Sequence, residues 1–319
     1  MKHKTTLFIS LILLVSLCLS GCTFGQKPFV EVVADWLYAD GTYYGTNRVF
    51  QKVSQPYYVK EEIVYQVDSD MELALLAKIL FDQGTMMFYV EDKDFMIGKA
   101  YAYLDALMIN AFKFSMGTKT YTQNDEIVRS LDYVKIELYN DTLSEVKKAV
   151  DTFIAEKINS TSDNSTKLKA LHDGLILSTQ YDTAVLDLDL RNIVDHTPFE
   201  AYGLFINHKA VCSGYSKAFM AVAQKLEIPV LTVSSNLMNH AWNMVYNGSD
   251  WKYVDVTFDD PVPDQAGKVV STYFMLSQST MTNGSATITA HLYDESSETT
   301  LNAADYLEFA LYVFPSTKH

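Results

Sequence analysis

The sequence lacks the features that mark three large classes of protein. It has 25 lysines and arginines against 39 aspartates and glutamates, a net charge of −14 and no basic cluster interleaved with aromatic residues, so no nucleic-acid partner is expected. It has neither a His-Glu-x-x-His motif nor paired Cys-x-x-Cys motifs, so we expect no metal centre and no cofactor. After residue 21, no apolar run reaches the length of a transmembrane helix. The composition, 48% hydrophobic and 13% aromatic, instead predicts a chain that folds around a large core.

The start of the chain predicts an export signal. Two lysines precede an almost unbroken apolar run over residues 7–19, which is too short to span a bilayer comfortably. The following Leu19-Ser20-Gly21-Cys22 resembles the lipobox of bacterial lipoproteins, in which the chain is cut before the cysteine and the sulfur is acylated. The resemblance implies a body tethered by lipid on Cys22 at the extracytoplasmic face of the cell membrane. An ordinary signal peptide with a chance cysteine is the alternative.

Cysteine is scarce, and this makes its placement informative. The leader would remove Cys18 and the lipid would consume Cys22, so the mature chain would keep one free thiol, Cys212, and could form no internal disulfide. A lone thiol in an exported protein is an inert buried residue, an intermolecular link or a nucleophile.

We expect four segments: the leader over residues 1–21, a mixed α/β region over 22–140, a core over 141–262 and an extension of that core over 263–319. In the mixed region, β-branched and aromatic runs or helical periodicity predict strands at 29–38, 57–67, 86–90 and 132–139 and helices at 71–81 and 99–112.

The core should open with a helix from Leu143 to about Ile158, because apolar residues recur at helical spacing and Thr142 with Glu145 fits a capping box. A polar loop over 159–165 and a helix over 166–180 should follow. Three strands are expected near the end of the core, over 230–234, 241–246 and 251–258.

Cys212 is predicted to open an amphipathic helix that runs to about Leu226. Unpaired backbone N–H groups and the helix dipole favour negative charge at a helix start. A thiol placed there is favoured as a thiolate, the form that acts as a nucleophile. An inert buried cysteine is the alternative at this position.

Two later residues could serve as a base and an acid. His240 begins one expected strand, and Asp255 lies in the next, where a buried carboxylate costs several kcal/mol unless it finds a partner. If residues 247–250 form a hairpin turn, the indices of paired residues sum to 497 and His240 lies opposite Thr257. Asp255 is then the diagonal neighbour of His240 on the same face, about 7–8 Å away at the backbone.

At these residues the sequence resembles the transglutaminase-like superfamily. Three motifs occur in the family's order: Cys-x-Gly-Tyr from Cys212, His-Ala-Trp-Asn from His240, and Trp-x-x-Val-Asp-Val-Thr-Phe-Asp-Asp-Pro from Trp251. Two supporting stretches, over 171–182 and 201–212, also match, and the resemblance covers about residues 166–261.

The resemblance implies an α+β fold with a papain-like core, in which the nucleophile helix packs on an antiparallel sheet. It also implies that Cys212 is the nucleophile, that His240 is the general base and then the acid, and that Asp255 fixes the imidazole. The substrate would be a protein, peptide or peptidoglycan-linked amide, which forms a thioester that is passed to an amine or to water. A catalytically silent scaffold or binding module at the cell surface is the alternative.

Four further residues have less definite roles. Tyr202 and Asn207 are possible oxyanion donors, but a core tyrosine and a loop asparagine are favoured. Asp259 and Asp260 are expected to form a turn before Pro261, and a calcium role for them is the less favoured alternative.

Overall fold

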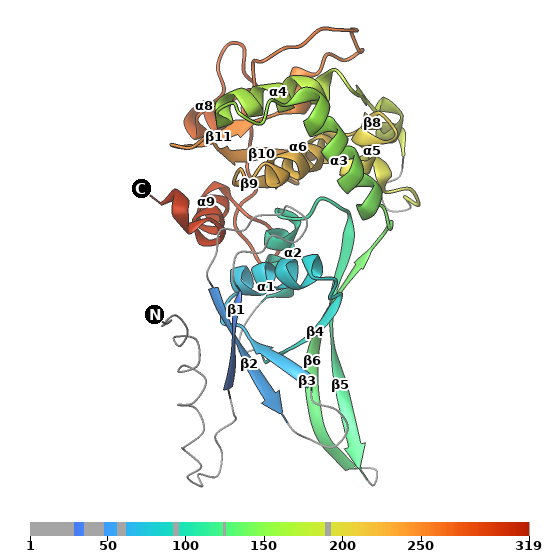
Figure 1. Cartoon of the computed structure of the whole chain (residues 1–319), viewed down its shortest axis with the longest axis vertical. Coiled ribbons are helices and arrows are strands. Elements are labelled where there is room, and N and C mark those ends of the chain that lie inside the picture. The colour runs from blue at the N-terminus through green and yellow to red at the C-terminus, as the bar shows by residue number, and fades with distance from the viewer. Residues whose placement is uncertain are drawn as a thin grey trace, which may run out of the picture.

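The computed structural model describes residues 29–34, 48–55, 62–91, 96–123, 126–188 and 193–318 (Figure 1). The expected leader and lipobox, with Cys22, lie outside these residues. Within the described ranges, no helix combines the length and the apolar character needed to cross a membrane. The architecture of the described residues is α+β, as predicted, with a six-stranded sheet, a three-stranded sheet and one short pair of parallel strands.

The first sheet has six strands in the order β1-β2-β3-β4-β6-β5. Its members are β1 (Phe29–Ala34), β2 (Arg48–Gln55), β3 (Glu62–Gln66), β4 (Met87–Glu91), β5 (Phe112–Gln123) and β6 (Glu126–Leu138). Strands β3 and β4 are parallel and the other neighbours are antiparallel. The parallel pair is joined by helix α1 (Asp70–Asp82), and α2 (Ile97–Asp105) follows β4.

The predicted helix over 99–112 is too long, because the structure ends α2 at Asp105 and begins β5 at Phe112. Strand β5 was not predicted, although its sequence contains several threonines, which favour strands. A long hairpin with β6 supplies the ladder that stabilises this strand. Tertiary pairing therefore decides the structure of this stretch.

The rest of the described chain forms the second unit. Its elements are α3 (Leu143–Lys157), α4 (Asn164–Ile176), β7 (Gln180–Tyr181), η1 (Thr183–Asp187), η3 (Thr197–Phe199), α5 (Ala201–Phe205), β8 (Lys209–Ala210), α6 (Cys212–Lys225), β9 (Val230–Ser235), β10 (His240–Tyr246), β11 (Trp251–Val254), α7 (Val256–Asp259), α8 (Gln278–Asn283), α9 (Ala303–Val313) and η4 (Pro315–Thr317). Strands β11, β10 and β9 form an antiparallel sheet in that order.

Two helix starts differ from the prediction. Thr142 precedes α3 but makes no capping hydrogen bond, because its hydroxyl donates to Glu200 Oε2 at 3.1 Å and accepts from Asn110 at 3.0 Å. The expected capping box is therefore wrong. Helix α4 begins at Asn164, inside the expected loop, since the Asp163 side chain caps it by accepting from the Thr166 N–H.

The three-stranded sheet is buried on both faces, and alternate side chains enter different clusters. One cluster receives Leu231, Val233, Trp242, Met244 and Tyr253, and the other receives Val230, Val245 and Val254. The first cluster also contains apolar residues of α1, α2 and α9, and the second contains those of α3, α4 and α6. Figure 1 shows α1 and α2 between the long strands of the first sheet and the second unit. One apolar core thus joins the region before residue 140 to the central sheet.

Buried polar contacts reinforce this junction. Lys217 on α6 is 4% exposed, and its ammonium lies 2.9 Å from Asp105 Oδ1 and 3.3 Å from the Asn110 carbonyl oxygen. The Thr232 N–H on β9 donates to the Ala106 carbonyl at 3.0 Å. The turn after α2 is therefore fixed to both the helix and the sheet that carry the candidate site.

We expect Phe309→Ala to lower the free energy of unfolding by about 3–5 kcal/mol, the usual cost of truncating a buried phenylalanine. Phe309 on α9 is fully buried and its ring centroid lies 4.5 Å from that of Tyr103 on α2. Urea denaturation followed by tryptophan fluorescence measures the change. Leu186→Ala, at a side chain that is 63% exposed, is the matched control and should cost little. Equal losses in both variants would contradict a shared core through α9.

Candidate active site

Cys212 lies at the first position of α6, where the chain turns from an extended segment into the helix. Val211, at the N-cap, has φ −98° and ψ 177° and makes no side-chain capping hydrogen bond. The first backbone N–H groups of the helix, beside Cys212, are therefore not satisfied by a side-chain cap. The Cys212 side chain is partly exposed. The position thus combines a locally positive helix end with access for a reactant.

The glycine of the Cys-x-Gly-Tyr motif has a packing reason. A Cβ atom at Gly214 would lie 2.5 Å from the Pro198 carbonyl oxygen and 2.8 Å from the Ala210 Cβ. The Val211 N–H donates to the same Pro198 carbonyl at 3.0 Å. Only glycine lets the first turn of α6 approach the chain around Pro198 this closely, and this contact fixes where Cys212 points.

His240 begins β10, and the motif that it opens connects this strand to the nucleophile helix. Trp242 is 1% exposed and packs in the first core cluster. Asn243 is equally buried, and its side-chain amide donates to the Ser216 carbonyl on α6 at 3.0 Å. Trp242 and Asn243 therefore hold β10 against the core and α6, as their expected packing role requires.

Asp255 follows the last residue of β11 and is fully buried. Its Oδ2 accepts a hydrogen bond from His240 Nε2 at 2.6 Å, and its Oδ1 accepts from the Phe258 N–H at 3.1 Å. The backbone N–H of Asp255 donates to the Tyr273 carbonyl at 3.0 Å. The side chains of His240 and Asp255 therefore meet, as the sequence predicted.

The hairpin register is confirmed, but the second strand was predicted too long. Tyr246 pairs with Trp251 and Asn243 with Val254, as indices summing to 497 require. The strand then ends, and residues 256–259 form α7, so His240 does not lie opposite Thr257. The physical reason is that the Asp255 carboxylate caps α7 through the Phe258 N–H, which favours a helical turn over continued pairing.

The charges around His240 favour an imidazolium. Burial alone would lower its pKa, but the charge and hydrogen bond of Asp255, followed by those of Cys212, raise the pKa of His240 to about 10. Burial would raise the pKa of Asp255, but the charge and hydrogen bonds of His240 and His291 lower it to about 2. Because Nε2 faces Asp255, Nδ1 is the ring nitrogen left for the sulfur. The arrangement can therefore hold a thiolate beside an imidazolium.

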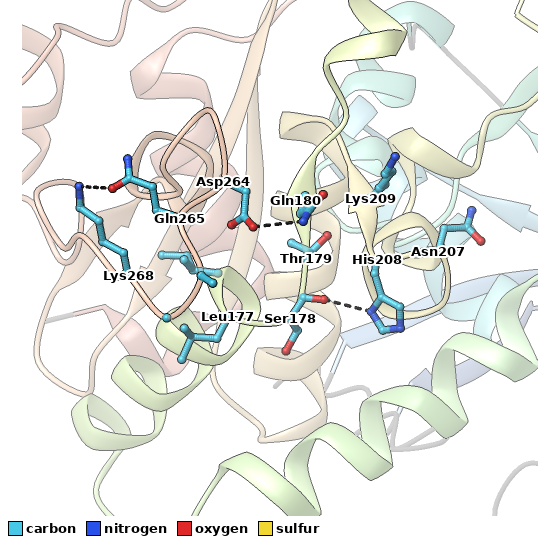
Figure 2. Close-up of a pocket in the computed structure, with 13 residues that line it drawn as sticks. Leu177, Ser178, Thr179, Gln180, Asn207, His208, Lys209, Asp264, Gln265 and Lys268 are labelled. Carbon is cyan, nitrogen blue, oxygen red and sulfur yellow. Dashed lines mark hydrogen bonds between the residues drawn. The ribbon is translucent and has the colours of Figure 1, made fainter.

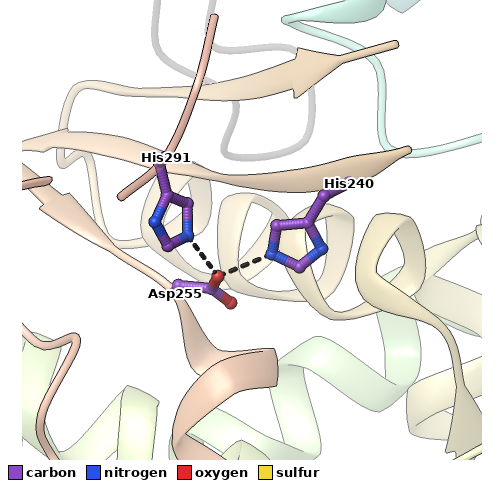
Figure 3. A group of neighbouring side chains, drawn as sticks. All are labelled: His240, Asp255 and His291. Atoms are coloured by element: carbon purple, nitrogen blue, oxygen red, sulfur yellow. Dashed lines mark hydrogen bonds and ion pairs between the residues drawn. The ribbon is translucent and has the colours of Figure 1, made fainter. Parts of the chain in front are cut away.

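His291 is a site residue that the sequence motifs do not predict. This fully buried histidine lies between α8 and α9, and its Nε2 is 2.8 Å from Asp255 Oδ2, the same oxygen that His240 contacts (Figure 3). It lies 36 residues beyond Asp255, outside the stretch that resembles the family. No motif surrounds it, so its being one of seven histidines was the only signal in the sequence.

His240, Asp255 and His291 offer ligand atoms that all lie within 4.8 Å of one another, a spacing that raises the question of a metal ion. The individual separations of 2.6 and 2.8 Å are those of charge-assisted hydrogen bonds. Two ligands on one tetrahedral zinc ion would lie about 3.3 Å apart. The described geometry is therefore that of a hydrogen-bonded cluster.

A second buried histidine–aspartate pair lies next to the site and holds α7 in place. His172 Nε2 on α4 lies 3.1 Å from Asp259 Oδ2, and both side chains are fully buried. Asp259 also accepts N–H hydrogen bonds from Thr272 and Tyr273. Asp259 was expected in a turn, but it is the last residue of α7. Its oxygens accept hydrogen bonds from backbone N–H groups. The pair joins α4 to α7, immediately after Asp255.

Asp260 bonds to the nucleophile helix. The Tyr215 hydroxyl donates to its Oδ2, and the side chain is 4% exposed. Burial raises the pKa of Asp260 to about 6, against the opposing hydrogen bond from Tyr215. This contact accounts for the tyrosine of the Cys-x-Gly-Tyr motif, because it connects α6 to the chain that follows Asp255.

The two possible oxyanion donors have other contacts. Asn207 is exposed and its amide donates to Thr197 Oγ1 at 3.1 Å, while Tyr202 packs at the edge of the second core cluster. Tyr181 on β7 is coupled electrostatically to the site: burial first, and then the charges of Cys212 and Asp255, raise the pKa of Tyr181 to about 12. Tyr181 therefore lies close enough to Cys212 to be affected by its charge.

A cavity of about 430 Å³ lies beside β7 and β8, the strand pair that leads to Cys212 (Figure 2). Gln180 donates to Asp264 across it at 3.1 Å, and His208 Nδ1 lies 3.0 Å from the Ser178 carbonyl oxygen. Cys212, His240 and Asp255 are not among its lining residues. The cavity is a neighbour of the candidate site and is separate from the reacting groups.

Residues 151–256 match the model of the transglutaminase-like superfamily. The resemblance deduced from the motifs is thereby confirmed over this segment, which contains Cys212, His240 and Asp255. No curated protein matches the chain.

The chain is similar to several solved structures, two of which follow. One is described as a crystal structure of a TGase, with 17% identity, coverage of 70% of this chain and 64% of that chain, and a TM-score of 0.32. The other is a proposed cysteine protease from Cytophaga hutchinsonii, with 13% identity, coverage of 50% of this chain and 68% of that chain, and a TM-score of 0.27. The chain therefore spans less than two thirds of the first of these structures.

The raised pKa of His240 predicts a pH-dependent contribution to stability. The unfolding free energy of the native chain minus that of His240→Gln should be largest below about pH 6.5 and should shrink as the pH rises toward about 10, because the folded state holds this proton more tightly than the unfolded state. The decrease should reach several kcal/mol, since each tenfold change in proton affinity is worth about 1.4 kcal/mol.

Urea denaturation across this pH range measures the difference. His208→Gln, at an exposed histidine, is the control for general effects of histidine replacement. A difference for His240→Gln that stays constant as the pH rises would show that His240 is not held as an imidazolium.

Proposed function

We propose that residues 151–256, the segment that matches the transglutaminase-like superfamily, form the core of a cysteine enzyme that acts on amide bonds through a thioester. The observation that carries the proposal is the 2.6 Å hydrogen bond between His240 and the buried Asp255, next to a partly exposed thiol at a helix start. A nucleophile, a base and an orienting acid are the three parts that such chemistry needs.

The proposed first half-reaction uses these three residues. The Cys212 thiolate attacks the amide carbonyl carbon, and the carbonyl π electrons move to the oxygen, which N–H groups at the start of α6 can stabilise. When the tetrahedral species collapses, the C–N bond breaks and the departing nitrogen takes the proton from His240 Nδ1. The products are an amine or ammonia and a thioester on Cys212.

In the second half-reaction, His240 acts as a base instead of an acid. An amine or a water molecule gives a proton to His240 as it attacks the thioester carbon. The C–S bond then breaks, and the thiolate and the imidazolium are restored. With an amine the result is acyl transfer and a crosslink, and with water it is hydrolysis or deamidation.

The proposed location is the extracytoplasmic face of a cell membrane, with the chain tethered by lipid on Cys22. The support is the order of lysines, apolar run, small residues and cysteine at the start of the sequence. The proposed substrates are protein, peptide or peptidoglycan-linked amides, which are the amides available outside the cytoplasm.

Iodoacetamide should alkylate Cys212 readily at neutral pH, and His240→Ala should slow this reaction about tenfold or more, because the imidazolium that stabilises the thiolate is lost. Mass spectrometry of the Cys212 peptide over time gives the rate without interference from other cysteines. His208→Ala, at an exposed histidine, is the control and should react at the native rate. Equal rates in the native chain and His240→Ala would remove the case for catalysis and leave a silent scaffold.

The reaction type can be read from one incubation of the native chain with a peptide library and a labelled primary amine. The proposal expects either label on glutamine-containing peptides or cleaved or deamidated peptides, and Cys212→Ser should abolish both. Products that persist in Cys212→Ser would show that the thiol is not the nucleophile.

A further inference from the structure

We propose that His291 is a positioning residue of the candidate active site: it donates its Nε2–H to Asp255 and holds that carboxylate aimed at His240. This inference deepens the proposed function and rests on it. It assigns a role to a histidine that lies outside the residues matching the superfamily model.

The hydrogen bond between His291 and Asp255 has a defined direction. His291 Nε2 lies 2.8 Å from Asp255 Oδ2. An ionised carboxylate can only accept a hydrogen bond, so Nε2 must carry the hydrogen. On the other side of the ring, Nδ1 lies 3.0 Å from the Thr289 carbonyl oxygen.

The other contacts of Asp255 favour its ionised form. The carboxylate accepts from His240 Nε2 and His291 Nε2 at one oxygen and from the Phe258 N–H at the other. Three N–H donors stabilise a charged carboxylate and leave little room for a proton of its own. Figure 3 shows the two imidazole rings approaching the same oxygen from different sides. Asp255 is therefore fixed between two donors.

Asp255 is the acidic side chain that His291 contacts. The titratable side chains that face His291 are His240, Asp255 and Tyr273, and its remaining ring contacts are with Trp242 and Phe258. The Tyr273 hydroxyl is engaged by the Thr289 N–H at 2.8 Å. Among the described residues, the acceptor left for His291 Nε2 is thus Asp255.

The contact has a consequence for the thiol. An Asp255 carboxylate that stays aimed at His240 raises the pKa of that histidine, and a charged His240 favours a thiolate at Cys212. His291 therefore acts on the thiol only through Asp255 and His240.

The backbone holds His291 in place. Its N–H donates to the Met281 carbonyl at 2.8 Å, and its ring packs at 81° to that of Trp242, with 4.9 Å between centroids. The segment after α8 is therefore fixed to the catalytic strand β10. The C-terminal part of the chain completes the candidate site as well as extending the core.

Two variants of the full chain test the role. His291→Leu removes the donor, and His291→Gln replaces it with an uncharged amide N–H. Cys212 alkylation by iodoacetamide at neutral pH should be about tenfold slower in His291→Leu, with much of the rate regained in His291→Gln. Thermal unfolding of both variants shows whether they are folded. Equal rates in both variants and the native chain would overturn the proposal.

Histidine-selective ¹⁵N labelling gives a readout that a purely structural role would not change. The His291 signals, assigned by their loss in His291→Gln, should show a hydrogen on Nε2 at neutral pH. A His291 Nε2 without a hydrogen in the native chain would overturn the proposal. So would a His291-dependent loss of alkylation on adding one equivalent of Zn²⁺, since that would identify a metal site.

Different results would overturn the proposed function and the role of His291. If His240→Ala does not slow alkylation, the proposed function fails, and the role of His291 fails with it. If His240→Ala slows alkylation and His291→Leu does not, the enzyme proposal stands and only the positioning role is lost.

Discussion

The candidate site depends on one buried carboxylate. Asp255 is fully removed from solvent, where an unpaired charge would cost several kcal/mol, so it must be surrounded by donors. The structure supplies three: the rings of His240 and His291 and the Phe258 N–H at the start of α7. The same contacts that satisfy the carboxylate end β11, begin α7 and orient the histidine toward Cys212. Folding and proposed chemistry therefore share one electrostatic requirement.

The motifs of the sequence correspond to contacts that hold the reacting groups in register. Gly214 permits the close approach of α6 to Pro198, and Asn243 fixes β10 to the Ser216 carbonyl of α6. Tyr215 bonds to Asp260, just beyond α7. The Asn243 and Tyr215 contacts join α6 to the parts of the chain that carry His240 and Asp255, and the Gly214 contact fixes α6 against the segment before it. The glycine, asparagine and tyrosine of the motifs thus have structural roles, and the proposed reaction is carried out by Cys212, His240 and Asp255.

Local signals in the sequence were sufficient for much of this frame. The helix from Cys212 and the register of the β10–β11 hairpin depend on nearby periodicity and turn residues, and both are present as predicted. The predictions failed where distant groups decide the structure. Thr142 gives its hydroxyl to Glu200 instead of capping α3. His291 reaches Asp255 across 36 residues through packing that no local pattern encodes. A side chain placed by the tertiary fold leaves no periodic signal in the sequence.

The central claim is that sulfur and imidazole form an ion pair before any substrate binds. The most direct measurement is the ultraviolet difference spectrum between the native chain and Cys212→Ser at neutral pH, where a thiolate absorbs and a thiol does not. We expect a thiolate band in the native chain that is lost in Cys212→Ser and weakened in Asp255→Asn. Identical spectra for the native chain and Cys212→Ser would contradict the ion pair and the mechanism built on it.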